Sequence, residues 1–98
     1  MEVEHHEDAE FVKWYRRLGS LEQAKVTWQL DLLMAVGASL GMPHVRDLGG
    51  GLRELRIRVV QQPRLYFEVD GDIARMLTCG RKDTQQRDIA RARGRKTR

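Results

Sequence analysis

The sequence predicts an α+β domain in which a helical hairpin packs on a small twisted antiparallel sheet, followed by a short C-terminal helix. Three observations support this fold class. Apolar residues recur at helical spacing over residues 8–18 and again over 20–40. Polar and apolar residues then alternate over 53–59 and 64–69, which is the period of strands with one buried face. Finally, Asp70-Gly71 is typical of a tight hairpin turn, because such turns need positive φ.

Length and composition limit the class of protein. The chain has 98 residues, enough for one domain with a single modest core. Its one cysteine excludes an intramolecular disulfide. The net charge of +4 is unevenly distributed, with four Lys/Arg and seven acids in residues 1–45 but fourteen and seven in residues 46–98. The basic second part points to a polyanionic partner, although the same charge can serve solubility alone.

We expect a cytoplasmic protein without cofactors. The N-terminus is acidic and has no apolar signal-peptide region, and no apolar run approaches the roughly 20 residues that cross a bilayer. His5 and His6 are adjacent, so on a strand they point to opposite faces and are poorly placed to bind one metal ion. The sequence has no other ligand spacing, so no metal is expected.

The N-terminal half supplies an edge strand and the two helices. Residues 1–7 alternate weakly and predict a short strand at the sheet edge. The first helix is predicted over 8–18 and the second over 20–40. Their large apolar residues, Trp14 and Trp28 among them, are interpreted as core and sheet-packing side chains.

Local signals place the ends of the second helix. Ser20 and Gln23 fit a capping box at its start, just after Gly19. Gly41 is a suitable C′ residue at its end, and Pro43 prevents continuation.

The second half supplies three strands and the last helix. A connector at residues 43–51 ends in three glycines, which we interpret as a hinge or turn because a P-loop would need Gly-Lys-Ser/Thr before a helix. Strands are predicted over 53–59, 64–69 and 72–79, with Pro63 at the first turn. The last helix follows Asp83 or Thr84, with Gln86 completing a capping box with Asp83. Its thin apolar face consists of Ile89, Ala90 and Ala92, and residues 94–98 are expected to form a basic flexible tail.

The strands carry a candidate site. Their alternation places Leu55, Ile57 and Val59 toward the core, and Arg56, Arg58, Arg64 and Tyr66 together on the other surface. Guanidinium groups bind phosphate and stabilise charge on a pentacoordinate phosphorus, and RNA carries its own 2′-hydroxyl nucleophile, so this set suits phosphodiester chemistry on RNA. Tyr66 would stack a base or donate a proton. The alternative is that these arginines are solvated strand residues paired with Glu54 and Glu68. Cys79 is expected to be buried and inert.

Three blocks of sequence together resemble a known family. Phe11 and Trp14 precede HVRDLGGGLRELRIR at 44–58, RLYF follows at 64–67, and LTCGRKDTQQRDIARAR spans 77–93. In this order they resemble the RelE/ParE superfamily of toxin–antitoxin toxins, specifically its HigB-like branch of phage-derived killer proteins. The family fold is a helical hairpin on a twisted antiparallel sheet, which agrees with the fold predicted above.

The resemblance implies a toxin that is an mRNA interferase. Such an endoribonuclease cleaves mRNA on the ribosome without a metal, which inhibits translation and arrests growth. It implies a hetero-oligomer with a cognate antitoxin, which in HigB-type modules resembles a helix-turn-helix DNA-binding protein. Arg56, Arg64 and the pair Arg81-Lys82 match the family's basic positions. The predicted catalytic set is therefore Arg56, Arg64, Arg81, Lys82 and Tyr66, with Asp83 or Glu54 as base and Arg53, Arg58, Arg87 and Arg91 as further RNA-binding cations.

Two functions stay open at this stage. No Tyr or His follows Lys82, whereas several RNases of the superfamily place a catalytic one near the C-terminus. The resemblance therefore also allows a non-enzymatic inhibitor, like the ParE-like branch, which acts on DNA gyrase.

Overall fold

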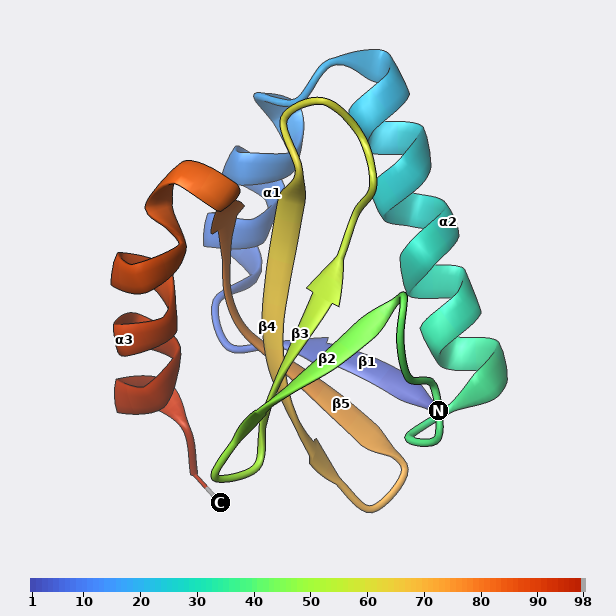
Figure 1. The fold of residues 1–98 in the computed structure, drawn as a ribbon, viewed down its shortest axis with the longest axis vertical. Coiled ribbons are helices and arrows are strands. Elements are labelled where there is room, and N and C mark those ends of the chain that lie inside the picture. Colours follow the sequence, from blue (N-terminus) through green and yellow to red (C-terminus); the bar gives the residue numbers. More distant parts are fainter. Residues whose placement is uncertain (98) are drawn as a thin grey trace.

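The computed structural model describes residues 1–97 and places helices on both faces of a five-stranded sheet (Figure 1). The strand order is β1-β5-β4-β3-β2. The elements are β1 (Glu2–His5), α1 (Asp8–Arg16), α2 (Ser20–Val36), β2 (Val45–Gly49), β3 (Leu52–Arg56), β4 (Pro63–Asp70), β5 (Ile73–Arg81), the 3-10 turn η1 (Lys82–Thr84) and α3 (Gln85–Arg95).

The sheet is mixed, which corrects the antiparallel prediction. β1 pairs in parallel with β5 at the sheet edge, while the other neighbouring strands are antiparallel. A parallel pair needs a long connection, and the chain between β1 and β5 supplies one because it contains both N-terminal helices and three strands. The α+β class, the helical hairpin and the terminal helix are as predicted.

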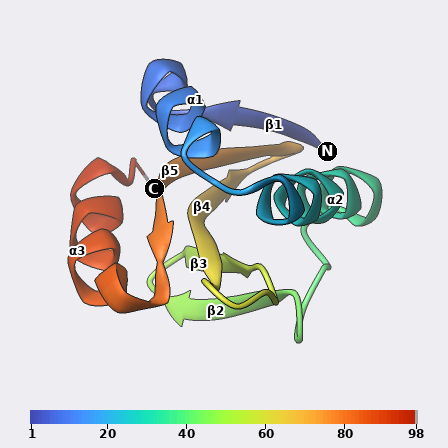
Figure 2. The same ribbon diagram turned by 90° about the horizontal axis from the view of Figure 1, so that it is seen from above.

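Each face of the sheet has its own apolar cluster. The hairpin of α1 and α2 covers one face and α3 the other (Figure 2). The larger cluster, beneath the hairpin, includes Val26, Leu33, Leu55, Leu65 and Phe67. The smaller cluster, beneath α3, consists of Leu52, Tyr66, Leu77 and Ala92, with Leu48 and Ile89 at its margin. The face opposite the hairpin is therefore largely buried rather than open to solvent.

The close approach of α3 depends on a glycine. Gly80 faces Asp88, and a Cβ at this position would overlap the Asp88 carboxylate. The Thr84 hydroxyl donates to the same carboxylate at 2.5 Å, and the Gly80 backbone leaves room for both groups. At the other end of the helix, Arg93 donates to the carbonyl oxygens of Leu48 and Gly49 at the end of β2. The last helix therefore contacts the start of the predicted glycine turn at residues 49–51.

The helix ends differ from the predicted ones. Gly19 is the N-cap of α2, and its N–H donates to the Glu22 carboxylate at 3.2 Å, while the Gln23 amide donates to the carbonyl oxygen of Tyr15. The helix ends at Val36, because Gly37 adopts a φ of 86° and its N–H bonds to Leu33. The predicted capping box and the predicted end near residue 40 are therefore wrong.

The start of α3 after Thr84 is as predicted, but its predicted capping box is not formed. Thr84 is its N-cap and makes no side-chain capping bond to the helix start. The Thr84 hydroxyl instead bonds to Arg81 and Asp88. The predicted box of Asp83 and Gln86 is not formed, because η1 occupies residues 82–84.

Two parts of the chain predicted to be irregular are ordered. β2 lies inside the predicted connector and pairs with β3. The segment predicted as a flexible tail contributes Gly94 and Arg95 to α3, and the N–H and hydroxyl of Thr97 both donate to the Glu68 carboxylate at 3.1 Å. Arg98 lies outside the described residues. Trp28, predicted as core, is 56% exposed and lies edge-on to His44.

Candidate functional site

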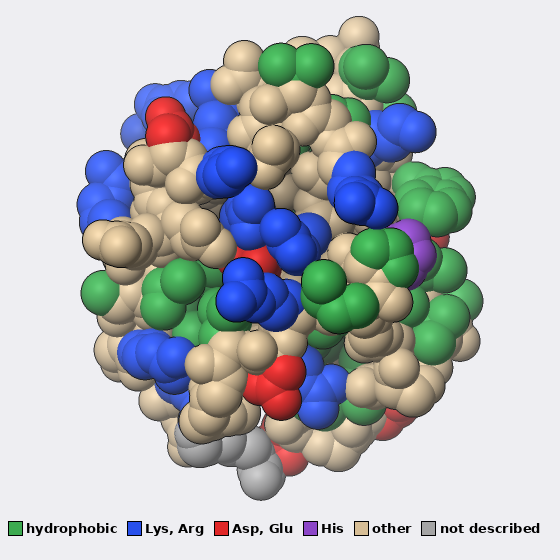
Figure 3. All heavy atoms as spheres, in the orientation of Figure 1, with side chains coloured by type: hydrophobic (Ala, Val, Ile, Leu, Met, Phe, Trp, Pro, Cys, Tyr) green, Lys and Arg blue, Asp and Glu red, His purple; other side chains and the backbone are tan. Residues whose placement is uncertain are grey.

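A groove rich in cations opens beside the ends of β3 and β4. Four of its seven lining residues are cationic, and blue side chains gather at the centre of this face in Figure 3. The volume is about 400 Å³. We call it the cationic groove; its lining residues are Arg56, Ile57, Arg58, Val59, Gln62, Arg64 and Lys82.

The floor of the cationic groove is a buried ion pair. Arg64 donates from Nη1 to Glu54 Oε1 at 2.8 Å, and their side chains are 4% and 0% exposed. Glu54 also accepts a hydrogen bond from Gln85 at 2.7 Å and lies 3.5 Å from Arg56 Nε. Arg64 Nη2 donates to Gln62, whereas its Nε has no partner among residues 1–97. This Nε is itself buried, so the donors that an anion in the groove can reach belong to the more exposed cations of the rim.

The rim of the cationic groove is exposed. The side chain of Arg56 is 32% exposed, and Arg58 and Lys82 are exposed residues. They come from the end of β3, the loop after it and the start of η1. Four cations around the single carboxylate of Glu54 leave this region with a net charge of +3. The groove is therefore suited to bind an anion such as a phosphodiester.

Tyr66 and Arg64 are more buried than the sequence suggests. Tyr66 is the register partner of Glu54, and its side chain is fully buried in the cluster beneath α3. Burial, with a smaller effect from the Glu54 carboxylate, raises the pKa of Tyr66 above its ordinary value. Tyr66 cannot stack a base in this arrangement, and Arg64 is not the exposed arginine that the alternation predicts, because α3 covers their face of the sheet.

The other predicted cations lie in several places. Arg81 pairs with Pro63 and lines a separate hollow beside α1, together with Arg87. Arg53 donates to the carbonyl oxygen of Ala38, next to the helical hairpin. Arg91 lies 3.8 Å from Glu10. Of the predicted catalytic cations, the cationic groove thus contains Arg56, Arg64 and Lys82, and of the predicted RNA-binding cations it contains Arg58.

The two predicted bases have different environments. Glu54 is fully buried, and Arg64, Arg56 and Gln85 surround its oxygens. Asp83 is exposed and lines a shallow depression that shares Gln62 and Lys82 with the cationic groove. The geometry favours Asp83 as the carboxylate that can reach a ligand.

Sequence reasoning missed the residues that support the groove from behind. Gln85 and Gln62 hold Glu54 and Arg64, respectively. Gln85 lies in the Thr-Gln of the 77–93 block that resembles the family, but only the fold shows that it and Gln62 support the ion pair. The buried pair itself agrees with the structural alternative in which the strand arginines pair with Glu54.

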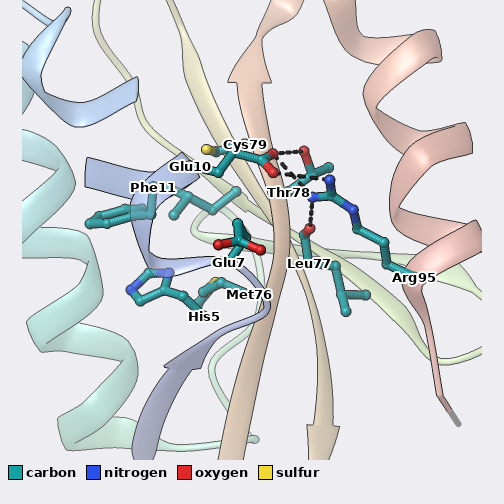
Figure 4. Close-up of a pocket in the computed structure, with 10 residues that line it drawn as sticks. His5, Glu7, Glu10, Phe11, Met76, Leu77, Thr78, Cys79 and Arg95 are labelled. Atoms are coloured by element: carbon teal, nitrogen blue, oxygen red, sulfur yellow. Dashed lines mark hydrogen bonds and ion pairs between the residues drawn. The ribbon is translucent and has the colours of Figure 1, made fainter. Parts of the chain in front are cut away.

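A second polar junction joins α1, β5 and α3 without forming a ligand site. Glu10 accepts hydrogen bonds from Arg95 and Thr78, and Arg95 also donates to the Leu77 carbonyl oxygen (Figure 4). The neighbouring hollow has a volume of only about 10 Å³, about the space that one water molecule needs. Burial raises the pKa of the adjacent Cys79 thiol to about 12, so it is a poor nucleophile near neutral pH.

His5 borders the same hollow and is partly buried. Its ring stacks on Phe11 with centroids 4.0 Å apart, and burial lowers its pKa, with Asp8 acting in the opposite direction. No group of three or more His, Cys, Asp or Glu side chains within residues 1–97 is arranged to hold a metal ion. In the same described range, no helix has the length and apolarity needed to cross a membrane.

Comparison with known proteins assigns the family. The family model of phage-derived Gp49-like proteins (DUF891) matches residues 13–97. The chain belongs to this Gp49-like family. It is a family of RelE/HigB-type toxins, so the chain is a toxin of the RelE superfamily, and such a toxin implies an antitoxin partner.

A solved structure agrees on the fold. The chain is similar to an arginine-to-alanine double mutant of the E. coli toxin RelE in the free state, with a TM-score of 0.63 at 13% sequence identity. The match covers 92% of this chain and 95% of that one. No curated protein matches the chain significantly.

Proposed function

We propose that this Gp49-like toxin is a ribosome-dependent mRNA endonuclease that inhibits translation without a metal ion. The observation that carries the proposal is the cationic groove, in which four cations surround one buried carboxylate. A transferring phosphodiester accumulates negative charge, and donors fixed in advance stabilise that charge without reorganisation. Arg64 is fixed by Glu54 and Gln62, whereas Arg58 and Lys82 remain exposed for contact with RNA.

The reaction uses the 2′-hydroxyl of the RNA as nucleophile. Its oxygen attacks the adjacent phosphorus, its proton passes to Asp83, and the bond to the 5′-oxygen breaks with a proton supplied by Lys82. The products are a 2′,3′-cyclic phosphate and a 5′-hydroxyl. Asp83 is chosen over Glu54 because the Glu54 oxygens are already engaged by Arg64 and Gln85.

A cognate antitoxin completes the proposal. The net charge of the cationic groove favours an antitoxin segment that is acidic, and a disordered segment that folds on binding suits such a surface. We propose that the antitoxin is a helix-turn-helix DNA-binding protein and that the pair forms a hetero-oligomer in the cytoplasm, where ribosomes and mRNA are found. Pull-down after co-expression with the product of the neighbouring gene tests this, and a chain that remains alone contradicts it.

The test of the activity is primer extension on mRNA bound to translating ribosomes. Lys82→Ala removes an exposed cation of the groove and should reduce cleavage by about 10²-fold, the usual scale for one transition-state donor. Lys25→Ala is the matched control, because Lys25 is an exposed lysine on α2 that lines neither the cationic groove nor the depression beside it. Treatment of the toxin with a chelator, removed before the ribosomes are added, should leave cleavage unchanged, because the protein's own chemistry is proposed to need no metal.

A specific result would replace this proposal. If the wild-type chain arrests growth while mRNA stays intact and gyrase is trapped on DNA, the chain is a non-enzymatic gyrase inhibitor instead. Equal cleavage by wild type and Lys82→Ala would exclude Lys82 as the proton donor to the 5′-oxygen.

A further inference from the structure

A second cationic hollow lies where the end of α1 meets η1 and the start of α3. In Figure 1 the end of β5 runs between α1 and α3 at this place. The hollow has a volume of about 290 Å³, close to the lower end of the roughly 300–1,000 Å³ range of ligand pockets. We call it the α1–η1 hollow; the residues that matter here are Trp14, Arg17, Leu18, Arg81, Asp83 and Arg87.

Three arginines from three different elements converge on the α1–η1 hollow. Arg17 is the C-cap residue of α1, Arg81 ends β5, and Arg87 lies in the first part of α3. Within residues 1–97, Arg17 and Arg81 make no ion pair. Arg87 lies 3.6 Å from Asp88, but its side chain is 68% exposed, so that pair is weak. The guanidinium groups are therefore available for an anion, and their fork geometry suits phosphate.

The same hollow has an apolar wall. Trp14 and the buried Leu18 line it together with the arginines. Trp14 is partly buried and also packs against the core, with its ring centroid 6.0 Å from that of Phe11. An indole held in this way beside free guanidinium groups is the combination that binds a nucleotide, since the ring stacks a base while the cations hold the backbone.

The α1–η1 hollow is connected to the cationic groove. Asp83 lines both the hollow and the shallow depression beside it, and that depression shares Gln62 and Lys82 with the groove. A continuous belt therefore runs around the end of the sheet from Arg58 to Arg17. One extended strand can follow this belt without leaving the surface.

We propose that the α1–η1 hollow binds a flanking nucleotide of the same single-stranded RNA whose scissile phosphate lies in the cationic groove. Arg17 and Arg81 contact its phosphate, and Trp14 stacks its base. The proposal rests on the proposed RNA-cleaving function and gives Arg81 a role in substrate binding outside the groove. It predicts that the length of RNA matters, because only a strand that reaches both sites gains these contacts.

The first test compares two adjacent arginines by fluorescence anisotropy with labelled single-stranded RNA of graded length. Arg17→Ala should weaken binding of long RNA several-fold and lower the slope of log K against log salt by about 0.7, the value for one phosphate contact on a single strand. It should not alter binding of RNA too short to reach the hollow. Arg16→Ala is the control, because Arg16 is an exposed cation of the same helix that does not line the hollow.

The second test observes the tryptophan directly. The chain has two tryptophans, so in a Trp28→Phe background the fluorescence reports on Trp14 alone. Long RNA should quench this emission in proportion to its binding, whereas short RNA should not. Thermal melts of each variant check that it is folded.

The outcomes separate this inference from the function on which it rests. If Lys82→Ala weakens RNA binding but Arg17→Ala behaves like Arg16→Ala and Trp14 is not quenched, the hollow is not a nucleotide site and the groove proposal stands. If the wild-type chain binds no free RNA at low salt, the inference about the hollow fails, whereas ribosome-dependent cleavage is decided separately by the primer-extension assay. Weaker binding of long RNA by Arg17→Ala together with Trp14 quenching supports the inference.

Discussion

Removal of Arg64 should destabilise the fold, because its guanidinium compensates a buried charge. The side chains of Arg64 and Glu54 are 4% and 0% exposed, and their charged atoms lie 2.8 Å apart. Breaking a buried pair by removing one partner costs roughly 3–5 kcal/mol. Arg64→Ala should fall at the lower end, about 3 kcal/mol, because Glu54 keeps its hydrogen bond from Gln85 and its neighbour Arg56. This replaces the expectation from sequence that an exposed Arg64 could be removed without effect on folding.

The assay is urea unfolding followed by circular dichroism. A loss of about 3 kcal/mol corresponds to a fall in Tm of roughly 12–24 °C for a domain of this size. The m-value should stay constant, since the surface exposed on unfolding hardly changes. Arg58→Ala is the control, because this groove cation is exposed and its removal should change stability by less than about 0.5 kcal/mol.

A double-mutant cycle shows whether the pair is coupled. The cycle consists of Arg64→Met, Glu54→Gln and the double variant, which removes both buried charges and should recover at least half of the loss caused by Arg64→Met alone. The reasoning is refuted if Arg64→Ala unfolds within about 1 kcal/mol of wild type and the effects of the two sites simply add. Because Arg64→Ala is expected to be less stable, its cleavage rate must be divided by the fraction of the variant that is folded before it is compared with the wild-type rate.

Three further predictions concern the rest of the fold. Deletion of residues 96–98 should lower the free energy of unfolding by about 1–2 kcal/mol, measured by urea titration, because Thr97 donates twice to Glu68. The hydrogen bond from Arg95 lowers the pKa of Glu10 in the folded state, so the ionised carboxylate stabilises the fold. This contribution to the free energy of unfolding is fully present above the unfolded pKa of about 4.3 and is lost as the pH falls through the lower folded pKa. The free energy of unfolding of Glu10→Gln, measured by urea titration at several pH values, should accordingly decrease less at acidic pH than that of the wild type. Cys79, with its pKa of about 12, should react slowly with a thiol reagent at mildly alkaline pH while the chain is folded. In urea, the rate of its modification should rise in parallel with the unfolded fraction.

The sequence predicted the elements whose patterns are local. The helical spacing around Trp14 indicated α1, and the alternation around Arg56 and Arg64 placed these two arginines on one face, where they are register partners. The turn at Gly71, with a φ of 58°, was also predictable, because few other residues adopt that conformation.

The missed features depend on tertiary contacts or on competing local signals. The sequence indicated a connector at β2 because its five residues, VRDLG, have two adjacent charged residues in the middle and end in glycine, yet pairing with β3 makes them a strand. The apolar pattern continues past Gly37, so it overestimates the length of α2. Alternation also shows which face of a strand opposes the core but not what covers that face. The burial of Glu54, Arg64 and Tyr66 follows from the docking of α3, whose apolar face is too thin to predict it.

The burial of Glu54 explains how cations can gather in one groove. Two like charges about 4 Å apart repel by roughly 4 kcal/mol at an effective dielectric constant of 20. The Glu54 carboxylate lies 2.8 Å from Arg64 and 3.5 Å from Arg56. The attraction of Arg64 and of Arg56 to this carboxylate therefore acts over distances shorter than about 4 Å and offsets such a repulsion. Because Gln85 fixes the carboxylate from α3, the orientation of Arg64 is set by the fold and not by the ligand. The last helix therefore organises the cationic groove even though it contributes none of the groove's lining residues.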